Sequence, residues 1–270
     1  MHIANVAFAI EGLLGQTITS YAKHPGSWDE NSITNGILAS LSRRTDLVYD
    51  FNGIATRIDW AGYKLHQTHE HNYGDIGILV NITHKDGYTV EGVAFVEAKK
   101  RKWNTARFDE LSKEDYGQLK RILRYAPRSM VLMYDYQDVT QSVTSKMQPN
   151  IWVNTYEIHG ITLSPIYSVI APSNLICAKR LKTTDKLYRF ALPFSYQLVF
   201  RYFSGHDLEF DSSKVKLVKE YDSKGRNPAY VLMGKIKKAG SMQELDQSVD
   251  IPDSIGDDLY RRVRKQDDRP

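Results

Sequence analysis

Cysteine is nearly absent from this chain. Cys177 is the only one among 270 residues, which excludes an internal disulfide framework and a cysteine-based zinc site and is typical of a reducing compartment. Long apolar runs are missing too, because no stretch approaches the roughly 20 apolar residues of a membrane span. The apolar segment Ile3–Leu14 contains Glu11 and has no basic region before it, so it predicts an amphipathic helix rather than a secretion signal. We therefore expect a cytoplasmic protein that does not enter a membrane.

Neither sign of charge dominates. The 36 Lys and Arg residues exceed the 32 Asp and Glu residues by only four, a formal net charge of +4. Attraction to nucleic acid would therefore have to come from local clusters of cations. The chain has no fixed-period repeat and no low-complexity tract, which argues against a solenoid or a mainly disordered protein. The composition is that of a globular protein long enough for one large domain or two small ones.

A helix is predicted near residues 28–43. Ser27 and Glu30 have the spacing of a capping box, in which the serine caps the helix and the glutamate reaches back to the serine amide. Apolar residues then recur every four positions, at Ile33, Ile37 and Leu41.

Three strands are predicted next. Strand-like patterns cover Thr56–Leu65, Asp75–Ile82 and Tyr88–Lys99. The turn residues Lys85–Gly87 separate the last two strands, so these two are expected to form a hairpin.

A second helix and a fourth strand follow the hairpin. Ser112–Asp115 is a capping signal, and Pro127 stops the helix before the apolar strand Met130–Tyr134. The predicted order is therefore α, β, β, β, α, β.

The second half of the chain has a less regular pattern. Apolar segments lie at Ile161–Ala171 and Leu187–Leu192, and a helix-like run at Phe194–Phe203 ends at Gly205. Two more strands are expected around Asp222–Gly225.

These patterns together predict a mixed α/β fold. We expect a core domain with an N-terminal helix at residues 1–140 and an α+β extension at residues 141–270, with one continuous domain as the alternative. The polar tail from about Ala239 is expected to be exposed or only partly helical.

The candidate chemistry lies in the predicted hairpin. Asp75 precedes Glu97-Ala98-Lys99 by 22 positions. Residues two apart in a strand point to the same face, so Glu97 and Lys99 project together, and Asp75 on the paired strand can approach them. Two neighbouring carboxylates repel each other unless a cation lies between them, and a hard divalent ion with oxygen ligands is the usual solution.

This pattern resembles the PD-(D/E)xK nuclease superfamily, whose hallmark is an acidic residue near the start of one strand and E-x-K on the next. The likeness covers about residues 28–134 and includes the α, β, β, β, α, β order, although Gly74 stands where the motif has proline. It implies a restriction-endonuclease-like core with a central mixed sheet. It also implies hydrolysis of phosphodiester bonds with Mg²⁺ or Mn²⁺ held by Asp75, Glu97 and the backbone carbonyl of Ala98.

The same resemblance suggests a DNA endonuclease in restriction or anti-phage defence, with DNA favoured over RNA as substrate. Such an ion polarises the phosphodiester and lowers the pKa of a bound water. Lys99 can orient the attacking water, deprotonate it, or stabilise the developing negative charge, and all three roles stay open.

Two further residues extend the candidate site. Glu30 lies on the first core helix, where members of the superfamily carry an additional acidic metal ligand; its capping-box position gives it a purely structural role instead. Gln118 lies on the helix after Lys99, where related nucleases place a glutamine that touches the substrate or a metal-bound water. Ile122 departs from the spacing of the best-known branch of the superfamily, so no branch is assigned.

Cations flank the motif and are expected to contact phosphates. They are Lys100, Arg101 and Lys102 after the strand and Lys120, Arg121 and Arg124 on the next helix. A solvated charged face is the alternative. Trp28 and Trp103 can stack on bases, but packing is the role that we expect for each.

Three other interpretations remain open. His66, His69 and His71 can bind zinc, which would make the protein a metallohydrolase of another class. The fold can also serve as a nucleic-acid-binding or assembly module without catalysis. The C-terminal half can mediate a homodimer or contact a partner protein.

Overall fold

The computed structural model describes residues 2–43, 47–51, 53–65, 73–109, 111, 116–140, 157–158, 161–162, 165–220, 222, 227–245, 251–256 and 259–263. All structural statements below concern this part of the chain.

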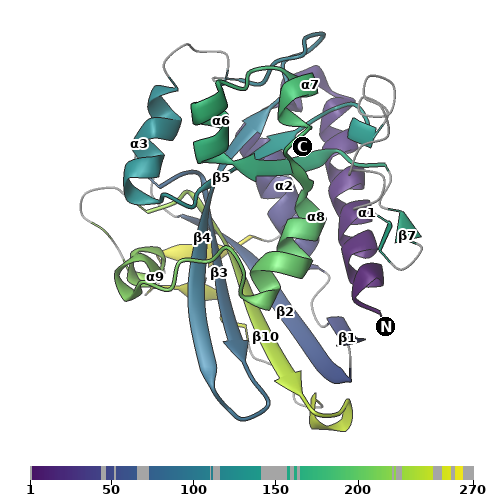
Figure 1. Cartoon of the computed structure of the whole chain (residues 1–270), viewed down its shortest axis with the longest axis vertical. Coiled ribbons are helices and arrows are strands. Elements are labelled where there is room, and N and C mark those ends of the chain that lie inside the picture. The colour runs from purple at the N-terminus through teal and green to yellow at the C-terminus, as the bar shows by residue number, and fades with distance from the viewer. Residues whose placement is uncertain are drawn as a thin grey trace, which may run out of the picture.

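A mixed β-sheet forms the centre of the molecule (Figure 1). Its strand order is β11-β12-β2-β10-β3-β4-β5-β8-β9, with β1 beside β2. Two pairs, β10 with β3 and β4 with β5, are parallel, and the other described pairs are antiparallel. The bounds are β1 Leu47–Phe51, β2 Ile54–Leu65, β3 Ile76–Thr83, β4 Thr89–Lys100, β5 Met130–Tyr134, β8 Ser168–Pro172, β9 Leu192–Pro193, β10 Tyr230–Ala239, β11 Ser254–Ile255 and β12 Tyr260–Arg262. A separate pair consists of β6 Glu157–Ile158 and β7 Ile161–Thr162.

Helices cover both faces of this sheet, as the predicted mixed α/β class requires. Leu38 of α2 (Glu30–Ser42) lies against Gly62, while Val218 of α9 (Ser212–Lys219) lies against Gly77. Gly62 and Ile78 are both in register with Leu232 of β10. Gly62 and Ile78 therefore point to the same face of the sheet, and Gly77, the residue before Ile78, points to the other face. The helices α2 and α9 thus lie on opposite sides of the sheet.

The other helical segments are α1 Ile3–Ala22, η1 Pro25–Ser27, α3 Gly117–Tyr125, α6 Ser173–Lys179, α7 Thr184–Leu187, α8 Phe194–Tyr196, η2 Gln197–Arg201, η3 Tyr202–Ser204 and η4 Gln243–Leu245.

The predicted hairpin is confirmed with its strands shifted by one residue. Ile76–Thr83 pairs antiparallel with Thr89–Val96. In the turn, Gly87 has a φ of +83°, and its N–H donates to the carbonyl of His84. Local turn chemistry therefore fixes the register that brings Asp75 to the motif on β4.

The predicted capping box is wrong. Asp29, not Ser27, is the N-cap of α2, and its side chain accepts a hydrogen bond of 2.9 Å from the Ser32 amide. The Ser27 hydroxyl instead donates to the carbonyl of His24. Because Asp29 competes successfully for the orphan amides of the first turn, Glu30 is the first helical residue and is released from any capping role.

The second helix and the fourth strand were predicted well. The strand Met130–Tyr134 is confirmed, and α3 ends at Tyr125, before Pro127. The capping signal at Ser112–Asp115 lies outside the described residues. Tyr116 stands at the N-cap position without a side-chain cap.

The C-terminal half completes the sheet. Strand β10 lies between β2 and β3, so both halves of the chain share one sheet, a topology that fits the continuous-domain alternative. One strand expected before Asp222 is instead the helix α9. The tail beyond Ala239 is not simply exposed, because β12 pairs with β2 and buries Tyr260. No helix in the described ranges combines the length and apolar character needed to cross a membrane.

Candidate active site

Strand β4 extends beyond its neighbour β3. The last pair between them is Val96 with Ile76, whereas residues 97–100 continue in register with Val131–Tyr134 of β5. On the side that β3 leaves open, the Ala98 amide donates a hydrogen bond of 2.9 Å to Oδ2 of Asp75. The N–H and C=O of one strand residue point to the same side. The Ala98 carbonyl, the ligand that the resemblance implies, therefore also faces the Asp75 side.

Backbone contacts fix the position of Asp75. Gly74 has a φ of +102°, and a Cβ at this position would lie 2.8 Å from the Val96 carbonyl oxygen. Proline, which is restricted to a φ near −65°, cannot adopt this conformation. The departure from the PD-(D/E)xK pattern at Gly74 therefore has a local steric reason. From the other side, the Tyr230 amide of β10 donates a hydrogen bond of 2.9 Å to the Asp75 carbonyl.

Four charged groups meet at this point: two on β4, one on α2, and Asp75, which directly precedes β3. Glu97 and Lys99 of β4 are buried, with 1% and 4% of their surfaces exposed. The Lys99 ammonium lies 2.6 Å from Oε1 of Glu97 and 3.3 Å from Oε2 of Glu30 at the start of α2. The structure thus brings together Asp75, Glu97, Ala98, Lys99 and Glu30, and it overturns the capping role for Glu30.

Burial controls the protonation of the two glutamates. It raises the pKa of Glu97 to about 8, with a further increase from the negative charge of Asp75, and the attraction of Lys99 only partly opposes this. Burial likewise raises the pKa of Glu30 to about 7. Burial alone would lower the pKa of Lys99, but the surrounding carboxylates outweigh it and raise that pKa. Three acids thus share one cation, and the two glutamates keep their protons to higher pH than free glutamates do, which reduces the negative charge of the metal-free cluster.

The donor set fits a divalent ion, although no group of three or more His, Cys, Asp or Glu residues within the described ranges is already arranged to hold one. Lys99 bridges Glu97 and Glu30, so one of these side chains has to move to admit an ion. Both buried carboxylate oxygens of Glu97 lack a well-aligned hydrogen bond. Carboxylate and backbone carbonyl oxygens are the ligands that Mg²⁺ and Mn²⁺ prefer.

The predicted phosphate contacts divide into two groups. Lys100 and Lys102 lie 3.3 and 3.6 Å from carboxylate oxygens of Asp109, and the cations of α3 (Lys120, Arg121 and Arg124) are exposed. These five stay predictions. Arg101 is different, because its side chain is buried and donates to Thr105, Asp135 and Gln137. Burial argues against the expectation that Arg101 contacts phosphate, since its Nε and Nη1 groups donate inside the protein.

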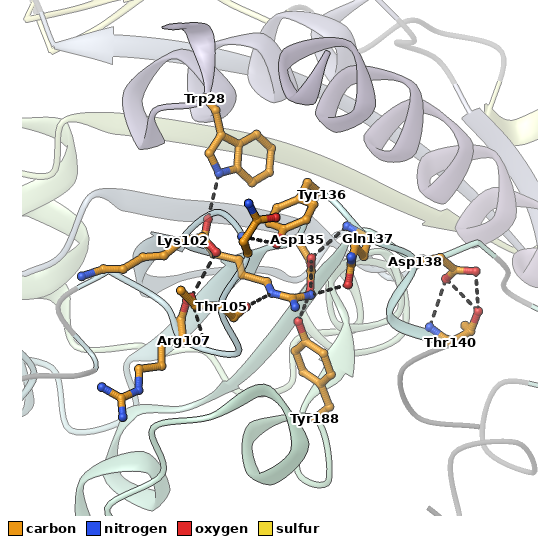
Figure 2. Close-up of polar contacts among 12 residues, drawn as sticks. Trp28, Lys102, Thr105, Arg107, Asp135, Tyr136, Gln137, Asp138, Thr140 and Tyr188 are labelled. Atoms are coloured by element: carbon orange, nitrogen blue, oxygen red, sulfur yellow. Dashed lines mark hydrogen bonds and ion pairs between the residues drawn. The ribbon is translucent and has the colours of Figure 1, made fainter. Parts of the chain in front are cut away.

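Figure 2 labels the hydrogen-bond partners of this arginine, which are Trp28, Thr105, Asp135 and Gln137. Arg101 binds both carboxylate oxygens of Asp135 at 3.0 Å, and the Tyr188 hydroxyl donates to the same carboxylate. Arg101 also lies over the Tyr136 ring. At the top of the view, the Trp28 indole N–H donates a hydrogen bond of 2.8 Å to the Arg101 carbonyl. Trp28 precedes Glu30 by two positions and Arg101 follows Lys99 by two, so this buried bond holds the start of α2 against the end of β4.

Sequence reasoning missed several neighbours of the cluster. Tyr134 and Tyr230 lie close enough for the Asp75 charge to raise the pKa of both phenols, after the larger effect of burial, which brings Tyr230 to about 12. Asp109 lies close enough to raise the pKa of Glu30. Tyr134 ends a predicted strand next to the motif and could have been considered. Tyr230 comes from the distant strand β10, and no local pattern pointed to it.

Two further expectations remain without a test. Gln118 lies on α3 with a buried side-chain oxygen that lacks a hydrogen-bond partner in the described structure. The described contacts do not link it to the carboxylate cluster. His66, His69 and His71 lie outside the described residues.

Comparison with known proteins does not extend these observations. No family model, curated protein or solved structure matches the chain. The assignment of a function therefore depends on the geometry of Glu30, Asp75, Glu97 and Lys99.

Proposed function

We propose that this protein is a divalent-metal-dependent nuclease with Asp75, Glu97 and Lys99 at the centre of its active site and Glu30 as an additional acidic ligand. The observation that supports this most is the convergence of three carboxylates and one lysine at the end of β4, where this strand extends past its last pair with β3. Burying charge is costly. A purely structural cluster would be expected to pair its charges evenly, whereas this one holds more acids than cations.

Each residue has a separable role in this proposal. Asp75, Glu97, Glu30 and the Ala98 carbonyl hold the ion, Mg²⁺ or Mn²⁺. When bound, the ion supplies a Lewis acid for a phosphodiester oxygen and lowers the pKa of water. Lys99, displaced from its bridge between the glutamates, orients the attacking water or stabilises negative charge on the phosphate.

A substrate panel tests the proposal. Single- and double-stranded DNA and RNA are incubated with the protein in Mg²⁺, Mn²⁺, Zn²⁺ or EDTA, and products are resolved by electrophoresis. We expect cleavage in Mg²⁺ or Mn²⁺ and none in EDTA, with DNA as the favoured substrate. Glu97→Gln, Asp75→Asn and Lys99→Met should each lower the rate by a factor on the order of 100 to 1,000 or more, because each removes a group that acts at the reacting phosphate.

The matched control is Lys85→Met in the turn at the opposite end of β4, which should retain the parent rate. Full activity in any two of the three site variants would contradict the assignment. Cleavage supported by Zn²⁺ alone and lost with His66, His69 and His71 would point to the zinc enzyme instead. Binding of nucleic acid without cleavage under every condition would favour the non-catalytic module.

A further inference from the structure

An exposed turn directly follows the candidate site. After Lys100, the chain forms a loop from Lys102 to Arg107 that returns to the sheet, where Arg101 and Phe108 make an antiparallel bridge. All six residues of this turn are exposed, and three of them are Lys102, Trp103 and Arg107. In Figure 2 the side chains of Lys102 and Arg107 extend away from the buried network around Asp135. The turn therefore presents two cations and an indole to solvent.

Internal hydrogen bonds fix the shape of this turn. The Lys102 amide donates to the Arg107 carbonyl at 2.9 Å, and the Thr105 hydroxyl donates to the Lys102 carbonyl at 3.1 Å. The buried Arg101 donates from below to the Thr105 carbonyl at 2.6 Å. The Asn104 amide, at a φ of +54°, donates to the Tyr136 hydroxyl at 2.8 Å. These bonds order the turn before any partner arrives, so binding costs little additional entropy.

Trp103 is held in place but not covered. Its ring centroid lies 4.4 Å from that of Tyr136 and 5.5 Å from that of Trp28, yet 37% of the residue remains exposed. An indole that packs fully into a core would not leave this much apolar surface in water. The two aromatic neighbours restrict its rotation, which makes it a fixed platform for another flat ring.

The turn is joined to the active-site cluster at two points. Trp28, which touches Trp103, leads into α2 and Glu30. Asp109 lies near Glu30 and pairs with Lys102 at 3.6 Å. A strand rises about 3.3 Å per residue, so Lys102 lies roughly 10 Å along the chain from Lys99. One short segment of nucleic acid can therefore reach both places.

We propose that the Lys102–Arg107 turn binds single-stranded nucleic acid, with an unpaired base stacked on Trp103 and flanking phosphates held by Lys102 and Arg107. This inference extends the proposed nuclease function, because it names an unpaired strand as the substrate at the same site. Bases inside a duplex stack on one another and cannot offer a face to an indole, whereas every unpaired base can. The exposed ion pair between Lys102 and Asp109 contributes little, so a phosphate can compete for Lys102.

Binding without cleavage tests this inference separately from the nuclease proposal. Fluorescein-labelled single-stranded DNA and RNA oligonucleotides and the matched DNA duplex are titrated with the full-length protein in EDTA, and anisotropy reports the dissociation constant. Trp103→Leu should weaken binding of single strands about five- to hundredfold while changing duplex binding little. Lys102→Gln and Arg107→Gln should weaken binding of both forms and lower the salt slope for single strands by about 0.7 for each lost contact.

The chain offers a matched control in the β3–β4 hairpin. Lys85 and Tyr88 place a cation and an aromatic ring, 64% exposed, in a turn at the opposite end of β4. Lys85→Gln and Tyr88→Leu should leave every dissociation constant unchanged. The thermal midpoint of each variant reports whether the fold is retained, and Trp103→Met supplies a second non-aromatic variant if Trp103→Leu does not fold.

The outcomes separate the two proposals. Single-strand binding that depends on Trp103, in a protein that cuts nothing with any metal, would support this inference and contradict the nuclease. The inference is overturned if the parent does not bind single strands, if Trp103→Leu or, where that variant does not fold, Trp103→Met binds them as tightly as the parent, or if the loss is equal for strand and duplex. Preference between the DNA and RNA strands identifies the natural polymer.

Discussion

The two ends of strand β4 are stabilised in different ways. At Thr89 the strand is paired with Thr83 of β3, and the adjoining turn is exposed and closed by local hydrogen bonds. At the other end, Glu97 and Lys99 are buried beyond the reach of β3 and depend on Asp75, Glu30 and the Trp28 bond. The exposed turn costs little free energy of folding, whereas the buried end concentrates charged groups away from water, which is unfavourable. This contrast between the two ends of one strand supports the proposal that the costly end is the functional one.

Substitution of two glycines, one near each end of β4, should give the largest difference between these ends. Gly74 and Gly87 both have positive φ, at +102° and +83°, but only a Cβ at Gly74 would meet backbone, the Val96 carbonyl oxygen. Gly87→Ala should therefore lower the free energy of unfolding by about 1–2 kcal/mol from backbone strain alone. Gly74→Ala should lower it by roughly 2–5 kcal/mol and also reduce cleavage, because Asp75 is displaced.

Chemical denaturation gives both free energies, and cleavage is measured where each variant is folded. Equal losses of stability and activity in the two variants would show that the approach of Gly74 to Val96 has no special role.

Two buried tryptophans allow a comparison with a smaller expected effect, between a position beside the candidate site and one away from it. Trp28 donates to the Arg101 carbonyl beside the site. Trp60 lies away from the site and donates a hydrogen bond of 2.5 Å to the Leu41 carbonyl. Replacing either residue by Phe keeps a large ring and removes one hydrogen bond to a buried carbonyl, at a cost of about 1–3 kcal/mol. Trp28→Phe should in addition lower Mn²⁺ affinity or cleavage by about 10- to 100-fold, because Glu30 loses its support.

Mn²⁺ titration of folded protein measures this effect, and Trp60→Phe is its control. If both variants bind Mn²⁺ as the parent does, Trp28 only packs.

The smallest expected effect is a dependence of stability on pH. The pKa values of Glu30 and Glu97 in the fold, about 7 and about 8, exceed the ordinary value of 4.5. Between pH 4.5 and 8 the folded protein therefore holds protons that the unfolded chain has released. The free energy of unfolding of metal-free protein should fall as pH rises through this window.

Glu97→Gln should flatten that fall, whereas Asp86→Asn in the exposed hairpin turn should not. Glu11, whose pKa burial raises to about 7, acts in the same direction and keeps part of the slope. Denaturation midpoints at several pH values in EDTA provide the measurement. An unchanged slope in Glu97→Gln would show that Glu97 does not hold its proton in the fold.

Local signals predicted much of the fold and the centre of the candidate site. Turn chemistry at Lys85–Gly87 and the period of two in β4 placed Asp75 beside Glu97 and Lys99, because both are properties of adjacent residues. The strand Met130–Tyr134 was clear because an apolar run follows a helix stopped by proline. The position of Glu30 was harder, since Ser27 and Asp29 are both good caps, and only the structure decides between them.

Features that depend on distant partners could not be predicted in this way. Arg101 belongs to a run of cations and looks like its neighbours, but Asp135 at the end of β5 draws its guanidinium inside. Strand β10 reads as an ordinary apolar segment, and its place between β2 and β3 follows from pairings far apart in the chain. No local sequence signal therefore predicted that Tyr230 lies beside the carboxylate cluster.

The place of β10 also sets when the carboxylate cluster can be completed during synthesis of the chain. Tyr230 leaves the ribosome long after Thr83, by a time on the order of 10 s at typical elongation rates. Until then β2 and β3 lack the strand that joins them, and Asp75 lacks the backbone donor that fixes it. A growing chain would thus carry all of Glu30, Asp75, Glu97 and Lys99 without a finished site. Under the proposed nuclease function, the active site would therefore be completed only after β10 has been synthesised.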